Sequence, residues 1–181
     1  MALDPTAVSI AVAGRGPPAV RRLSLLRAAG AHPLFFSDLP VQGLELPAEA
    51  LRQRLPSEND LAELGALWIV GLPHPDTVTL AARAGRRRVL VNVEDDPPLC
   101  DFHNVAEVRR GDLLLTVATG GRSPALAARI RARLAREFGP EWTGRLATIG
   151  AWRQAWRAEG RSTAEVARLT DEALLRAGWT V

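Results

Sequence analysis

The chain has 181 residues, 47% of them hydrophobic and 24% charged, which is the composition of a globular protein that can bury a core of its own. No run of about twenty apolar residues is present and residues 1–7 lack the pattern of a signal peptide, so we expect a cytoplasmic protein without a membrane span. The single cysteine, Cys100, excludes an internal disulfide and fits a reducing compartment.

Charge alone does not indicate a nucleic-acid partner. The formal net charge is only +3, and every basic side chain is an arginine, a residue that stays charged far above neutral pH. Arginine clusters at residues 86–88, 109–110 and 129–136 could bind phosphates or carboxylates, or could simply be solvated helix faces. Because no nucleic-acid recognition motif accompanies them, we predict no nucleic-acid partner.

The beginning of the chain predicts a strand, a glycine turn, a helix and a second strand. Residues 8–13 form an apolar run that breaks at Gly14, and residues 19–29 have apolar side chains at helical spacing. Gly30 predicts the end of that helix, and residues 33–36 predict a strand. Residues 39–56 are expected to form a loop or an irregular helix.

The following residues continue the alternation of strands and helices. A helical turn is expected at 61–64, a strand at 67–70, a helix at 75–84 and a strand at 88–93. This order predicts an α/β, Rossmann-like domain over residues 1–100, with a mostly parallel sheet and right-handed crossovers.

After residue 100 the pattern changes. We expect a strand at 102–108, a buried strand at 113–118 and a long helix at 123–138, which together form a second, smaller α/β module over residues 101–138. Two amphipathic helices follow at 141–158 and 163–177, in a helical region over residues 139–181, with Ser162 or Thr163 as the cap of the second helix. For Trp142, Trp152 and Trp156, packing in a core or a dimer surface is favoured over a platform for a porphyrin.

The first glycine turn fits the dinucleotide pattern G-x-G-x-x-A, with Gly14, Gly16 and Ala19 between a strand and a helix. Such glycines let the backbone approach a pyrophosphate at the start of a helix. Asp38, at the end of the second predicted strand, could accept a hydrogen bond from a ribose hydroxyl, which favours NAD over NADP. The alternative is that the glycines only make a tight turn.

The turn also contains residues that weaken a phosphate site. Pro17 and Pro18 have no backbone N–H, so two donors at the start of the helix are missing. Arg15 could replace them with a side-chain contact to phosphate, or it could mark a cofactor site that has been lost.

Two further segments contain residue types that are common in ligand-binding sites. The strand at 88–93 is followed by Glu94, Asp95 and Asp96, at the edge of an α/β sheet where ligands bind; the alternative for these carboxylates is a turn cap. The turn at residues 119–121 precedes a helix that begins near Ser123, an arrangement that suits an anion and in which Ser123 is also the expected N-cap. The three histidines show no ligand spacing, so no resident metal site is predicted.

Four motifs occur in the order typical of one family. They are Asn92-Val-Glu-Asp95-Asp-Pro, Leu99-Cys-Asp-Phe102, Val108-Arg-Arg-Gly-Asp-Leu113 and Thr119-Gly-Gly-x-Ser-Pro124. On these motifs the chain resembles the siroheme synthase amino-terminal family, and the layout matches from about residue 8 to about residue 138. The resemblance implies a precorrin-2 dehydrogenase, which removes a hydride and a proton from precorrin-2 with NAD and gives sirohydrochlorin.

The resemblance also assigns roles to residues. Asp95 matches the catalytic aspartate of the family and would act as a general base. The tetrapyrrole is expected at Arg109, Arg110, Thr119, Gly120, Gly121 and Ser123, and NAD at Gly14, Arg15, Gly16, Ala19, Asp38, Asn92 and Val93.

Further expectations follow from the same resemblance. The module over residues 101–138 would form a homodimer, and Fe2+ or Co2+ could be a second substrate, because some members are also sirohydrochlorin ferrochelatases. We expect a stand-alone enzyme without a methyltransferase module. The alternative is a binder of nucleotide or tetrapyrrole without catalysis, or a chelatase only. Arg15 stands where relatives usually have a glycine, and the turn that begins at Gly71 also departs from the family pattern.

Overall fold

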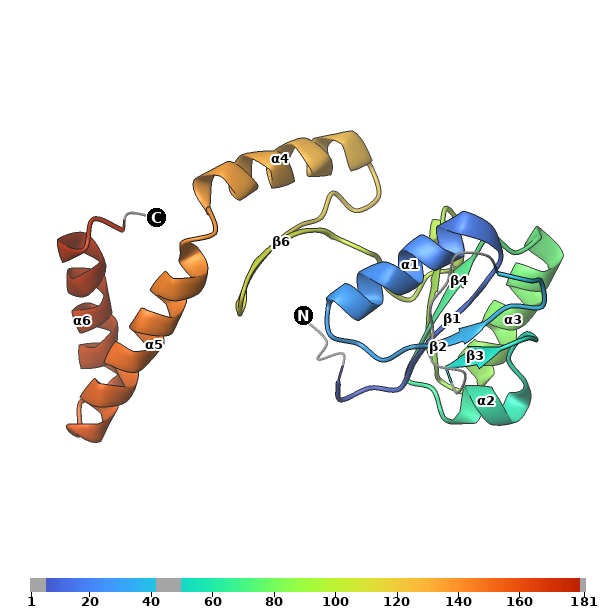
Figure 1. The fold of residues 1–181 in the computed structure, drawn as a ribbon, viewed down its shortest axis with the longest axis horizontal. Coiled ribbons are helices and arrows are strands. Elements are labelled where there is room, and N and C mark those ends of the chain that lie inside the picture. The colour runs from blue at the N-terminus through green and yellow to red at the C-terminus, as the bar shows by residue number, and fades with distance from the viewer. Residues whose placement is uncertain (1–5, 42–49, 180–181) are drawn as a thin grey trace. The chain divides into compact units, whose positions relative to one another are not determined.

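The computed structural model describes residues 6–41 and 50–179, and the chain divides into two compact units, Met1–Asn104 and Val105–Val181 (Figure 1). We call them unit 1 and unit 2 and describe each by itself. The division into three regions expected from the sequence stays a prediction. Among the described residues, no helix has the length and apolar character needed to cross a bilayer.

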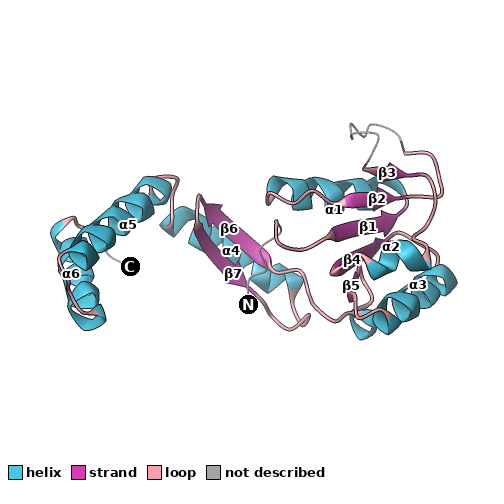
Figure 2. Ribbon diagram, turned by 90° about the horizontal axis from the view of Figure 1, so that it is seen from below, coloured by secondary structure: helices cyan, strands magenta, loops and turns pink. Residues whose placement is uncertain are grey.

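Unit 1 is an α/β unit around a five-stranded, entirely parallel sheet with the strand order β3-β2-β1-β4-β5 (Figure 2). The predicted Rossmann-like fold is therefore confirmed, and the carboxyl ends of all the strands lie at one edge of the sheet. The strands are β1 (Ile10–Gly14), β2 (Leu34–Phe36), β3 (Leu51–Arg52), β4 (Ala66–Val70) and β5 (Leu90–Val93).

Both faces of the sheet are covered by helices. Alternate side chains of β1 point to opposite faces: Ile10 and Val12 pack with the first helix, while Ala11 and Ala13 pack with the other two. Strands buried on both faces read as continuous apolar runs, which is why the sequence predicted them. The helices are α1 (Gly16–Ala28) on one face, and α2 (Glu58–Ala62) and α3 (His74–Arg86) on the other.

Two elements of unit 1 differ from the sequence-based expectation. Strand β3 corrects the loop or irregular helix expected at 39–56, because Leu51 and Arg52 pair with β2 at the edge of the sheet. Residues 42–49 of that segment are outside the described residues. Helix α2 begins at Glu58, so the helical turn expected at 61–64 was placed too late. The missed signal is a capping box, in which the Ser57 hydroxyl accepts from the Asp60 N–H and the Asp60 carboxylate accepts from the Ser57 N–H at 2.7 Å.

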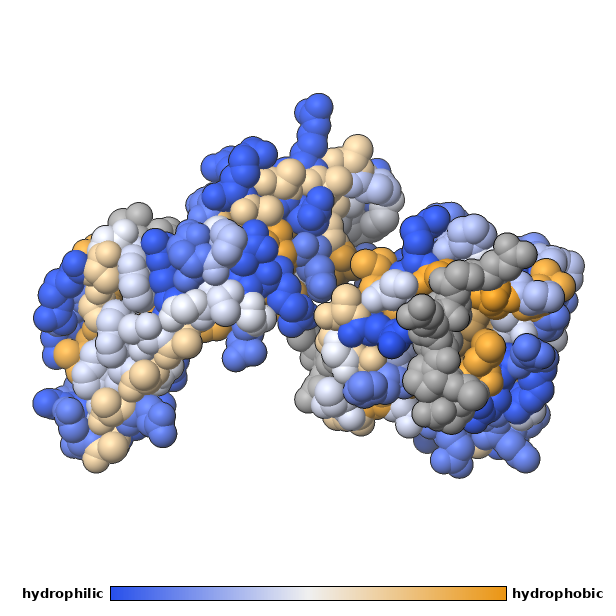
Figure 3. All heavy atoms as spheres, in the orientation of Figure 1, coloured by the Kyte–Doolittle hydropathy of each residue, from blue (hydrophilic) through white to orange (hydrophobic). Residues whose placement is uncertain are grey.

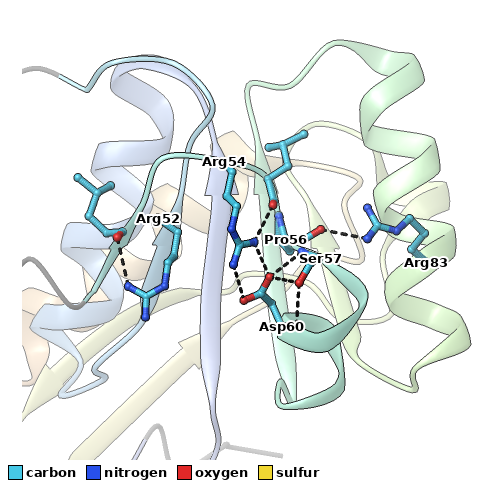
Figure 4. A network of polar contacts seen from close by, with 8 residues as sticks. Arg52, Arg54, Pro56, Ser57, Asp60 and Arg83 are labelled. Atoms are coloured by element: carbon cyan, nitrogen blue, oxygen red, sulfur yellow. Dashed lines mark hydrogen bonds and ion pairs between the residues drawn. The ribbon is translucent and has the colours of Figure 1, made fainter.

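Asp60 is the centre of a polar network that joins α2 to the segment after β3 (Figure 4). Its Oδ1 accepts from Arg54 Nη2 at 3.0 Å, and the Arg54 hydrogen bonds, followed by those of Ser57, hold the pKa of Asp60 well below its usual range. Arg83 extends the network to α3 by donating to the Pro56 carbonyl at 3.1 Å and to Glu58 at 2.7 Å.

Unit 2 begins with the antiparallel hairpin of β6 (Ala106–Arg110) and β7 (Leu113–Val117), on which α4 (Pro124–Glu137) packs. The strand expected at 102–108 starts only at Ala106, because Phe102 packs against Trp68 in unit 1 and Asn104 is hydrogen-bonded there. The chain ends in the helix pair α5 (Trp142–Ala158) and α6 (Thr163–Arg176), and Ser162 caps α6 in a capping box with Glu165, as predicted.

The burial expected for the strand at 113–118 is not found within one chain. No residue of β7 is fully buried, although Leu113, Leu114, Leu115 and Val117 are all apolar. The physical reason is that a two-stranded sheet with one packed helix offers too little cover. On α4 itself, Leu126 is 50% and Ile130 38% exposed, and the surface view shows apolar residues between hydrophilic ones over unit 2 (Figure 3).

The tryptophans of unit 2 pack among themselves and with arginine. Trp142 is buried and lies 5.2 Å from the Phe138 ring, which agrees with a core position. Trp152 stacks on Trp179 with ring centroids 5.6 Å apart, and the Arg145 guanidinium lies over the rings of both Trp142 and Trp179. These contacts hold the end of the chain against α5.

The Asp60 network predicts a stability that depends on pH. Replacing Asp60→Asn should lower the free energy of unfolding at pH 7 by about 1–2 kcal/mol, because a cap and a charged hydrogen bond are lost. The folded-state pKa of Asp60 is lowered. Its contribution is therefore present above the unfolded-state pKa of about 3.9 and is lost as the pH falls through the folded-state pKa.

Urea unfolding of the full chain at several pH values measures this difference. The gap between the natural chain and Asp60→Asn should narrow below about pH 4. Glu63→Gln, the same change of charge on an exposed residue next to α2, is the matched control and should show no such gap. A gap that is constant from pH 7 to pH 3 would contradict the assigned network.

Candidate dinucleotide and active site

The first part of the candidate site is the glycine turn between β1 and α1. A Cβ atom at Gly14 would lie 2.3 Å from the Val70 carbonyl oxygen and 2.7 Å from the Cβ of Ala19, so no side chain fits there. The Arg15 N–H donates to the same Val70 oxygen at 3.0 Å and joins the turn to the end of β4. Strand, tight turn and helix thus form the cradle that a dinucleotide needs.

The end of β4 approaches this turn equally closely. Gly71 has φ +67°, and a Cβ atom there would lie 2.6 Å from the Arg15 carbonyl oxygen. The turn after β4 departs from the family pattern, yet it retains a glycine where the two backbones meet. Pro17 and Pro18 lie in the first turn of α1, so two helix-start donors are missing, as predicted.

The Arg15 side chain forms ion pairs with carboxylates from two other elements. Its Nε donates to Asp38 Oδ1 at 2.7 Å and its Nη2 to Asp38 Oδ2 at 2.6 Å. The same Nη2 lies 3.3 Å from Asp76 Oδ2 in the first turn of α3. Asp38 therefore stands at the predicted place after β2, but both of its oxygens are occupied by Arg15, whose hydrogen bonds lower the pKa of Asp38.

Asp76 was not among the residues expected from the sequence. An acidic residue in the first turn of a helix is common because it complements the helix dipole, and nothing in its spacing points to Arg15, 61 residues earlier.

The second part of the site is the turn after β5. Asp95 has φ +64°, a left-handed conformation that is strained for most residues and that is found preferentially at functional sites. The Asp95 side chain is exposed, and none of the hydrogen bonds and ion pairs found among the described residues engages its carboxylate. Next to it, Asp96 Oδ2 lies 3.7 Å from Nδ1 of His74, the first residue of α3. No sequence pattern indicates this pair, because His74 and Asp96 lie on different elements and are far apart in the chain.

Asn92 and Val93 form the end of β5, but their polar groups are used inside unit 1. The Asn92 amide donates to the Phe102 carbonyl at 2.8 Å and accepts from Asn104 Nδ2 at 2.8 Å. The Val93 N–H donates to Cys100 Sγ at 3.2 Å. These bonds hold residues 100–104 against the sheet, so Asn92 and Val93 shape the edge and their bonded groups are not free for a ligand.

In unit 2, the turn at residues 119–121 is closed by its own hydrogen bonds. The Thr119 hydroxyl accepts from the Ser123 N–H and donates to the Ser123 carbonyl, each at 3.2 Å. The Ser123 hydroxyl accepts from the Leu126 N–H at 3.2 Å, so Ser123 is the predicted N-cap of α4. Gly120 and Gly121 complete the turn with positive φ angles.

The two arginines predicted to bind substrate differ in their surroundings. Arg110 donates from Nε to the Phe138 carbonyl at 2.8 Å and from Nη2 to the Ala135 carbonyl at 3.1 Å, so it holds the end of α4. Arg109 is exposed, and among the described residues its guanidinium has a single, distant ion pair, at 3.9 Å from Glu107. Unit 2 contains 13 of the 23 arginines but 8 of the 20 acidic residues, so it is the basic unit of the chain.

No cluster of metal-ligand side chains occurs in the part of the chain that the structure describes. The structure thus brings Gly14, Arg15, Gly16, Ala19, Asp38 and Asp95 to the carboxyl edge of one sheet, and it places Arg109, Arg110, Thr119, Gly120, Gly121 and Ser123 in unit 2.

The chain is similar to known proteins over most of its length. The family model "NAD_binding_7: Putative NAD(P)-binding" matches residues 1–106. A siroheme synthase of Thioalkalivibrio sulfidiphilus is 33% identical over 174 residues, which are 93% of this chain and 33% of the relative. A siroheme synthase of Methylobacillus flagellatus is 35% identical over 144 residues, 77% of this chain and 31% of the relative. The chain thus spans about a third of the length of these curated relatives.

A solved structure has the same fold. The protein "SirC, precorrin-2 dehydrogenase" superposes with a TM-score of 0.69 at 20% identity, covering 95% of this chain and 87% of the other.

The close approach at Gly14 gives a testable prediction. Gly14→Ala should destabilise the chain by about 1–3 kcal/mol, because its Cβ has no room against the Val70 oxygen. Gly85→Ala is the matched control, since a Cβ there meets nothing within 4 Å and alanine is the better helix former by about 1 kcal/mol. Urea unfolding should show opposite signs for the two variants; equal effects would refute the tight packing at Gly14.

Proposed function

Because the chain belongs to the siroheme synthase amino-terminal family, we propose that it is an NAD-dependent dehydrogenase that converts precorrin-2 to sirohydrochlorin. The observation that carries the proposal is the combination, at one edge of one sheet, of the glycine cradle after β1 and the exposed carboxylate of Asp95 after β5. The superposed protein is a precorrin-2 dehydrogenase and the relatives are siroheme synthases, which supports the proposal.

The cradle fits a nicotinamide dinucleotide. Gly14 and Ala19 pack the turn closely onto β4, Gly16 begins α1 where a pyrophosphate would bind, and Asp38 stands where a ribose hydroxyl would be bound. A carboxylate at that place accepts from hydroxyls and repels an additional phosphate, so the cofactor we propose is NAD. When bound, the cofactor accepts the hydride.

Asp95 is the proposed general base. As hydride leaves the substrate, a proton must leave too, and an exposed carboxylate without a partner among the described residues can accept it. The left-handed backbone at Asp95 turns the chain away from β5 immediately after the strand, so this carboxylate is not drawn into the sheet contacts that occupy Asn92.

Unit 2 would supply residues that bind the tetrapyrrole substrate. The substrate is a polycarboxylate, and the basic unit offers Arg109 as an exposed guanidinium, together with the turn at residues 119–121 before α4. Arg110 would act indirectly, by holding α4 in place.

We further propose that the chain is a homodimer through unit 2. The support is the uncovered apolar surface of β7 and α4, which a second copy would bury. Metal insertion with Fe2+ or Co2+ as substrate is a second proposal, in which Asp95 would also accept the pyrrole protons.

Asp95→Asn tests the assigned base. Asparagine has nearly the same shape and tolerates a left-handed backbone, so the fold should persist, whereas it cannot accept the proton. We expect the anaerobic conversion of precorrin-2, followed by absorbance with and without NAD, to fall by about a hundredfold or more, with unchanged NADH affinity. Asp112→Asn in unit 2 repeats the change of charge as a control. Unchanged turnover in Asp95→Asn would refute the role of Asp95.

The dimer is tested by sedimentation. The double variant Leu126→Glu and Ile130→Glu introduces charges on the exposed face of α4 and should convert a dimer to a monomer. Leu175→Glu is the control, because Leu175 is 72% exposed on α6 and away from that face. A natural chain that sediments as a monomer at micromolar concentration would contradict the homodimer.

One observation favours a second candidate, a binder of tetrapyrrole or a chelatase that has lost the cofactor. Arg15 occupies Asp38, and two helix-start donors are missing. If folded protein gives no conversion with NAD but still binds sirohydrochlorin, with or without inserting Co2+, this second candidate replaces the first.

A further inference from the structure

The Arg15 guanidinium lies between two carboxylates that come from opposite sides of β1. Asp38 follows β2 and Asp76 lies in the helix that follows β4, and β1 is the strand between β2 and β4. One nitrogen, Nη2, contacts both carboxylates, at 2.6 Å and 3.3 Å. The guanidinium therefore has two alternative partners within reach of the same atom.

We propose that Asp76 is a positioning residue for cofactor binding, which takes the guanidinium over from Asp38 and so frees Asp38 for the ribose. The inference rests on the proposed function and assigns Asp76, a residue without a role so far. The exchange requires only rotation of the Arg15 side chain. The backbone of Arg15 is fixed, because its N–H is bonded to Val70 and its carbonyl is packed against Gly71.

The exposure of the three side chains makes such an exchange easy. The side chains of Arg15, Asp38 and Asp76 are 21%, 33% and 44% exposed, and ion pairs of this kind are weak. A ligand that offers hydroxyls to Asp38 and phosphate to Arg15 can replace their mutual bonds. After the exchange, Asp76 would hold the guanidinium beside the turn in which Pro17 and Pro18 provide no donors.

For the loss of the Asp76 charge, the proposal predicts a change in dinucleotide affinity opposite to the one that simple electrostatics predicts. Arg15, Asp38 and Asp76 together contribute a net negative charge, which repels a phosphate. If charge alone mattered, removing the charge of Asp76 would strengthen the binding of a dinucleotide. If Asp76 instead becomes the ion-pair partner of Arg15 when the dinucleotide binds, removing that charge leaves Arg15 paired with Asp38 and weakens dinucleotide binding.

Calorimetric titration of the full chain with NADH measures this without turnover. Asp76→Asn should weaken binding about tenfold, whereas Asp76→Glu, which keeps the carboxylate, should stay within about threefold of the natural chain. In an Arg15→Gly background, Asp76→Asn should change the affinity by less than about twofold, because the guanidinium it holds is gone. Asp171→Asn on α6 is the control for net charge.

Four outcomes would overturn the inference. Tighter binding by Asp76→Asn would mean that only charge matters. The same loss in the Arg15→Gly background would mean that Asp76 acts through α3 and not through Arg15. A natural chain that does not bind NADH would overturn the proposed function as well, whereas a natural chain that binds while Asp76→Asn is unaffected would overturn this inference alone. If Asp76→Asn does not fold, as judged by thermal unfolding, Asp76→Ser replaces it with the same expectation.

Discussion

The contact between the ends of β1 and β4 is the constraint on which the candidate site depends. The two backbones meet so closely that Gly14 and Gly71 have no room for a side chain, and one hydrogen bond from Arg15 to Val70 joins them. This contact fixes the position of the start of α1 and the path of the backbone between β4 and α3. Because the Arg15 backbone is part of it, the guanidinium is delivered to the middle of the edge, between Asp38 and Asp76.

At the end of β5, the carboxyl edge of the sheet is held by hydrogen bonds between polar groups, several of them buried. Asn92 exchanges hydrogen bonds with Phe102 and Asn104, and Trp68 donates to the Asn104 side chain at 3.0 Å. A fully bonded network of this kind is rigid, since every opened bond leaves a buried group unpaired. It fixes the strand end before the turn in which Asp95 takes its left-handed backbone conformation.

Much of this could be predicted from local sequence patterns, and the rest depends on contacts that such patterns do not contain. Strands buried on both faces, the glycine turn and the Ser123 and Ser162 caps each have a signature within a few residues. The Arg15 ion pairs join residues 23 and 61 positions apart, and no spacing rule indicates them. Hydropathy marked β7 as apolar, but it does not say whether the cover comes from the same chain.

The left-handed backbone at Asp95 also limits how this chain can change over generations. Only glycine, asparagine and aspartate adopt that conformation readily, and a single base change in an aspartate codon gives either of the other two. Both substitutions remove the carboxylate and leave the turn intact. Under the proposed role of Asp95, a lineage could thus lose the reaction in one mutational step without any loss of folding, and a binding protein would remain.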